Sequence, residues 1–105
     1  MTAAKLRKLK ARLQQLRGSS AKPRKLEALA KALGRQRMKR GSEPTWVSES
    51  FPGLRPLSIP HHSKEIKRFT AENILDQLEA QDVVAWERRL AAAQGETHAG
   101  HDEDA

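Results

Sequence analysis

Two adjacent histidines, His61 and His62, are the residues of this chain best suited to acid–base chemistry near neutral pH. An imidazole titrates close to neutrality and is cationic when protonated, so it can transfer a proton or contact a phosphate. On an extended segment, neighbouring side chains point to opposite sides, so the two rings are not expected to act as a close pair. His62 could instead hydrogen-bond the turn that leads to Lys64 and Glu65, and both interpretations stay open.

The charge of the chain is divided unevenly along its length. Residues 1–40 carry 14 Lys or Arg and one acid, Glu27, whereas residues 41–105 carry 6 Lys or Arg and 12 acids. A dense positive field of this kind favours a polyanionic ligand such as RNA, although a basic arm could also serve solubility alone. The expected RNA contacts are Lys39, Arg40, Ser42, His61, Lys64, Lys67 and Arg68.

The elements that must position these residues begin with a basic helix over residues 3–17. It carries leucines at spacings of three, four and three, which places them on one stripe: Leu6, Leu9, Leu13 and Leu16. The stripe needs a partner, either the rest of the chain or a second copy in a homodimer, and the basic face could lie along phosphates. Because Gly18, Ser19 and Ser20 form a joint, we predict that residues 1–20 are a unit separate from the domain that follows.

Residues 22–90 predict an α+β domain. A helix begins near Pro23 and ends at Gly34 in a left-handed conformation. Three short strands follow near residues 37–39, 45–47 and 57–59, and Thr70 is the expected N-cap of a last helix. The order α-β-β-β-α packs two helices on one face of a three-stranded antiparallel sheet, as in domains that bind double-stranded RNA. Residues 91–105 are small, polar and acidic, which predicts a disordered tail.

Within this frame, several stretches resemble the HicA family. They are Leu57–Lys67 (LSIPHHSKEIK), Thr70, Asn73–Leu78 (NILDQL), Lys25–Gly34 (KLEALAKALG) and Arg40-Gly41-Ser42, and they span residues 22–80. HicA proteins are small toxins of bacterial toxin–antitoxin pairs. The resemblance implies a fold like that of double-stranded RNA-binding domains (dsRBD-like), translation inhibited through binding or cleavage of mRNA, and neutralisation by a HicB-type antitoxin.

The sequence departs from the family at its catalytic position. The family's histidine after Gly-Ser is replaced here by Glu43, which Pro44 follows. A glutamate is anionic at neutral pH unless strongly desolvated, so it repels a phosphate, although it could act as a general base. The favoured function is therefore a HicA-like toxin, or a protein derived from one, that binds mRNA. The alternatives are a metal-independent endoribonuclease working through His62 or Glu43, and a module that binds another protein.

Composition excludes several other classes of protein and of functional site. There is no cysteine, so disulfides, thiolate zinc sites and cysteine nucleophiles are ruled out. No apolar run approaches the roughly 20 residues that a membrane span needs. His98 and His101 lie near acids but in the expected tail, where no fixed metal geometry forms. We therefore expect a cytoplasmic protein without a metal or cofactor.

Overall fold

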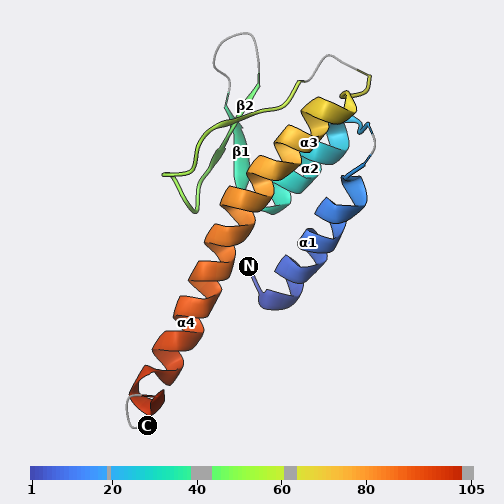
Figure 1. Cartoon of the computed structure of the whole chain (residues 1–105). Helices are drawn as coiled ribbons and strands as arrows, with labels where there is room; N and C mark the ends of the chain where they lie inside the picture. Colours follow the sequence, from blue (N-terminus) through green and yellow to red (C-terminus); the bar gives the residue numbers. More distant parts are fainter. Residues whose placement is uncertain (19, 39–43, 61–63, 103–105) are drawn as a thin grey trace.

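The computed structural model describes residues 1–18, 20–38, 44–60 and 64–102, with side chains described as far as Gln94. Within these residues, four α-helices, one π-helical segment and three short strands form an α+β fold (Figure 1). The sheet is antiparallel in the order β1-β2-β3. In chain order the elements are α1 (Ala3–Leu16), α2 (Pro23–Ala32), β1 (Arg35–Met38), β2 (Thr45–Ser48), β3 (Leu57–Ser58), α3 (Arg68–Gln77), η1 (Leu78–Val83) and α4 (Val84–Asp102).

Helices α2 and α3 pack against the sheet. Helix α2 contacts β1 and helix α3 contacts β3, and Figure 1 shows both helices on the same side of the sheet. Helix α2 begins at Pro23, and Gly34 follows it with a φ of 103°, so both predictions for this helix are confirmed. Proline suits a first turn because its missing N–H has no acceptor there, and glycine tolerates the left-handed conformation that ends a helix.

Helix α1 belongs to the core rather than to a separate unit. The side chains of Leu6, Leu9 and Leu13 are buried in the same cluster as Leu29 and Leu78, and α1 contacts both α2 and η1. Of the two partners that the sequence left open for the leucine stripe, the structure shows the rest of the chain. The chain's own helices bury three of its four leucines, and Leu16 is half-buried. A leucine stripe reveals that a helix needs an apolar partner but not where that partner lies in the chain.

The last helix begins earlier than its sequence suggests. Its N-cap is Lys67, and the Ala71 amide donates to the Lys67 carbonyl at 2.8 Å, so the helix already includes Thr70. The expected cap at Thr70 is wrong because an isolated antiparallel bridge between Ala21 and Ile66 fixes the backbone immediately before Lys67. The chain enters the helix as soon as this tertiary contact ends.

The same helix also continues further than expected. Helix α3 passes through η1 into α4, which reaches Asp102, so residues 91–102 are helical where composition predicted a disordered tail. The three alanines at positions 91–93 favour this continuation, because alanine has the highest helix propensity of all residues. None of the helices in the described residues is long and apolar enough to cross a membrane.

A buried ion pair joins the sheet to the π-helical segment. Arg35 donates to both carboxylate oxygens of Asp82, through Nε at 2.9 Å and Nη2 at 2.8 Å, and both side chains are at most 1% exposed. Its Nη1 donates to the carbonyls of Trp46 and Arg55 at 2.9 and 3.0 Å. Burial raises the pKa of Asp82, while the hydrogen bonds and charge of Arg35 act in the opposite direction. Four hydrogen bonds from one guanidinium thus hold β1, β2 and η1 together.

Candidate nucleic-acid interface

The Ala21–Ile66 bridge places the first turns of two helices side by side. The Ala21 amide donates to the Ile66 carbonyl at 3.2 Å, and the Ile66 amide donates to the Ala21 carbonyl at 2.7 Å. One residue further along each segment is the N-cap of a helix, Lys22 for α2 and Lys67 for α3. The two helices therefore begin at the same end of the molecule.

Both helix beginnings attract anions. Neither N-cap lysine supplies a side-chain acceptor to the first-turn amides, and neither helix has an acid in its first turn. Backbone N–H groups at a helix start carry partial positive charge, and those without an intrahelical partner suit a phosphate oxygen as acceptor. The start of α2 offers fewer such donors, because Pro23 has no N–H and the Lys25 amide donates to the Lys22 carbonyl at 3.0 Å. Two such starts held together give a wider positive surface than either would alone.

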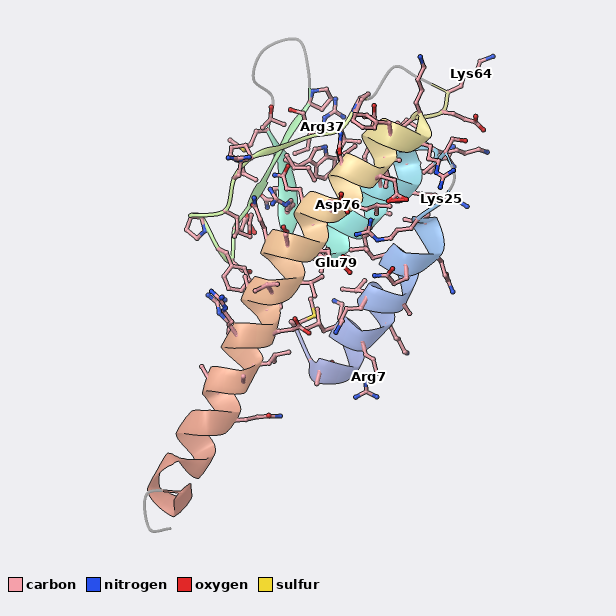
Figure 2. All side chains as sticks on the ribbon, viewed as in Figure 1. Arg7, Lys25, Arg37, Lys64, Asp76 and Glu79 are labelled. Atoms are coloured by element: carbon pink, nitrogen blue, oxygen red, sulfur yellow. The ribbon has the colours of Figure 1, made fainter. Side chains whose placement is uncertain are left out.

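Six basic residues surround the two helix beginnings, and we call them the helix-end cluster. All six side chains are exposed, and none forms an ion pair with any residue that the structure describes. Figure 2 shows Lys25 and Lys64 at this end of the molecule. Glu65 lies in the same segment and accepts a hydrogen bond from Ser20 Oγ at 3.4 Å. The cluster consists of Lys22, Arg24, Lys25, Lys64, Lys67 and Arg68.

A shallow groove leads away from the cluster between α1 and α2. Its volume is about 370 Å³, and Lys25 and Arg12 line it together with Gln15, Leu16 and Ala28. Lys25 belongs to the cluster, whereas Arg12 belongs to the exposed face of α1. Basic side chains thus continue from the helix beginnings onto the N-terminal helix, which the core leucines hold in place.

The acids of α3 and η1 face a different part of α1, and we call this contact the acidic seam. Arg17 donates to Glu72 at 2.8 Å, to Asp76 at 2.7 Å and to Glu79 at 2.8 Å. The hydrogen bond with Asp76 is the main cause of a raised pKa for Arg17. These carboxylates are therefore occupied within the fold, and they neutralise Arg17 rather than the helix-end cluster.

The structure brings together part of the predicted contact set. Lys64, Lys67 and Arg68 all lie in the helix-end cluster. The other predicted residues, including both candidate catalytic positions, lie outside the described residues: Lys39, Arg40, Ser42, Glu43, His61 and His62.

Sequence reasoning missed Lys22, Arg24 and Lys25 as members of this surface. The available signal was a basic residue directly before a predicted helix start at Pro23. The bridge that brings this start beside α3 joins residues 45 positions apart, and no pattern in the sequence predicts it.

Within the described residues, no group of three or more acids and histidines is placed to hold a metal ion. Comparison of the chain with protein-family models, with curated proteins and with solved structures found no match.

Proposed function

We propose that this protein binds RNA through the helix-end cluster, as a dsRBD-like, HicA-like toxin or a protein derived from one. The observation that carries the proposal is the set of six exposed cations around two adjacent helix beginnings that lack acidic or capping side chains. Phosphate contacts by Lys and Arg release counterions, and they supply most of the affinity in sequence-independent binding.

The topology supports the dsRBD-like part of this proposal. Helix α2, the sheet in the order β1-β2-β3 and helix α3 follow one another in the α-β-β-β-α order of such domains. These domains recognise RNA mainly through backbone shape and phosphates rather than through base sequence. Cationic groups at a helix beginning are appropriate to that kind of recognition.

The proposed biological effect is inhibition of translation through binding of mRNA, relieved by a HicB-like antitoxin. Glu43 favours binding over cleavage, because an ionised carboxylate repels a phosphodiester where the HicA family places a histidine. We expect the purified protein to bind an end-labelled mRNA without metal and to cleave it slowly or not at all. Replacement of Glu43→His should increase cleavage. Rapid cleavage by the unaltered protein that His62→Ala abolishes would instead establish the ribonuclease alternative.

A pair of matched variants tests the binding surface. Lys67→Gln with Arg68→Gln removes two cations from the helix-end cluster. Arg55→Gln with Arg88→Gln removes two exposed cations elsewhere. Titration of a structured RNA at several salt concentrations should show steep salt dependence for the unaltered protein and for the Arg55/Arg88 variant. The Lys67/Arg68 variant should bind more weakly and with a shallower salt dependence. Equal affinity of the two variants would contradict the proposed surface.

A further inference from the structure

One aromatic ring is exposed beside the helix-end cluster. Phe69 lies in the first turn of α3, next to Arg68, and its side chain is 77% exposed. The chain contains four aromatic residues in all. Among the described residues, Phe69 is the one large hydrophobic residue whose side chain is exposed.

The three other aromatic residues are used in packing. Trp46 is buried in the core and is 6% exposed. Phe51 and Trp86 pack edge to face with ring centroids 4.8 Å apart, and the Arg89 guanidinium lies 4.1 Å from the centre of the Phe51 ring. Phe69 has no such partner among the described residues. Burial of a phenylalanine side chain stabilises a fold, whereas the exposed ring of Phe69 contributes little to stability.

The surroundings of Phe69 indicate what kind of group would cover it. Lys67 and Arg68 precede it directly, and the uncapped beginning of α3 lies at the same place. Phosphates held there would bring the bases of the same strand close to the ring. Proteins that bind single-stranded RNA combine a basic track with aromatic side chains on which bases stack.

We propose that Phe69 stacks on an unpaired base of the RNA that the helix-end cluster holds. The preferred ligand class is then RNA with unpaired bases, in a single strand, loop or bulge, because bases within a regular duplex are stacked on each other and cannot receive the ring. This inference rests on the proposed RNA binding and adds to it the structural class of the ligand.

The test compares two probes with the full-length protein: a 12-nucleotide single strand of uridines and a 12-base-pair RNA duplex at the same salt concentration. Phe69→Ala should weaken binding of the single strand by about 5- to 150-fold and leave duplex binding unchanged, since stacking acts only on an accessible base. Phe69→Leu keeps an apolar side chain without an aromatic face and should lose nearly as much.

Phe69→Trp provides a direct signal. This variant should keep its affinity for the single strand, and its fluorescence should be quenched on binding by more than that of the native protein, whose indoles are Trp46 and Trp86. Thermal melting of all three variants should match the native protein, because the Phe69 ring is not part of the core.

The outcomes separate the two proposals. If the native protein binds neither probe, the proposed RNA-binding function fails, and this inference fails with it. If the native protein binds but Phe69→Ala weakens both probes equally or neither of them, only the stacking inference is overturned. The exposed ring would then belong to a surface for another partner, such as an apolar segment of a protein.

Discussion

The helix-end cluster and the acidic seam both involve basic residues beside α3, but only the seam neutralises them. At the seam, Arg17 meets the carboxylates of Glu72, Asp76 and Glu79 within 2.8 Å. At the start of the same helix, Lys67 and Arg68 form no ion pair within the described part of the chain, and the first turn contains no acid. Net charge alone does not distinguish these two situations. The positions of the acids decide which cations stabilise the fold and which remain available to a ligand.

The largest effect is expected from the arginine that the fold uses most completely. Arg35→Met removes four hydrogen bonds and leaves the Asp82 carboxylate buried without its partner. We expect the free energy of unfolding to fall by about 3–5 kcal/mol in denaturant titrations. The double variant Arg35→Met/Asp82→Leu should recover part of this loss. A loss below about 1 kcal/mol in the single variant would show that the pair contributes little to the fold.

The pH dependence of the Arg35→Met variant follows from the pKa of Asp82. Burial already raises this pKa, and removal of the arginine takes away the groups that lower it. The folded variant then keeps a proton that the unfolded chain releases above about pH 4, so its stability should fall as pH rises through the folded pKa. The stability difference from the native protein should therefore be larger at pH 7 than at pH 4. A difference that shrinks with rising pH would contradict this account.

The next effect concerns whether α1 is a fixed part of the fold or an appended arm. Leu13 is 1% exposed, so Leu13→Ala should leave a cavity and cost about 2–5 kcal/mol of stability. Gln15→Ala on the exposed side of the same helix is the matched control and should change stability by less than about 0.5 kcal/mol. Thermal or urea unfolding measures both. Near-native stability of Leu13→Ala would restore the separate N-terminal unit that the sequence suggested.

A smaller effect is expected at the acidic seam. Arg17→Gln removes the cation that three carboxylates share, and the Arg17 side chain is 22% exposed, so solvent screens part of the interaction. We expect a loss of about 1 kcal/mol that diminishes as salt is added. Arg12→Gln, on the exposed face of the same helix, should have no measurable effect on stability. Equal losses in the two variants would mean that the seam is not a specific contact.

The smallest effect on stability is expected in the comparison of two lysines. Lys10 pairs with Glu87 at 2.9 Å, whereas Lys67 has no ion pair among the described residues. Both Lys67→Gln and Lys10→Gln should change stability by less than about 0.5 kcal/mol. Only Lys67→Gln should reduce the slope of log affinity for RNA against log salt, by about 0.7–0.9 for one lost phosphate contact. The same change in slope for Lys10→Gln would remove the distinction between paired and unpaired cations.

Local sequence signals predicted the parts of the fold that depend on local chemistry. Proline at a first turn and glycine after a last turn marked both ends of α2, and alternation placed the strands within one or two residues. The sequence also predicted Lys64, Lys67 and Arg68 as RNA contacts from their charge, and the structure places these three cations in the helix-end cluster.

Contacts between distant segments explain where the structure differs from the sequence predictions. The Ala21–Ile66 bridge starts α3 before its apparent cap at Thr70, and the pairing of Arg35 with Asp82 joins residues 47 positions apart. Neither pairing has a periodicity or motif that could reveal it. The sequence did not predict Lys22, Arg24 and Lys25 as part of the candidate interface for the same reason. Only the bridge brings the start of α2 beside Lys64.

The burial of α1 sets a constraint on the order in which the chain can fold during synthesis. Helix α1 (Ala3–Leu16) rests against η1 (Leu78–Val83), so its leucines have no complete binding face until η1, more than 60 residues further along, has been synthesised. Contacts between segments so far apart slow folding, and a growing chain exposes its unsatisfied apolar surface in the meantime. The nascent protein must therefore carry an incompletely covered leucine stripe until residues 78–83 have been added, because α2 supplies only part of the face on which the stripe packs.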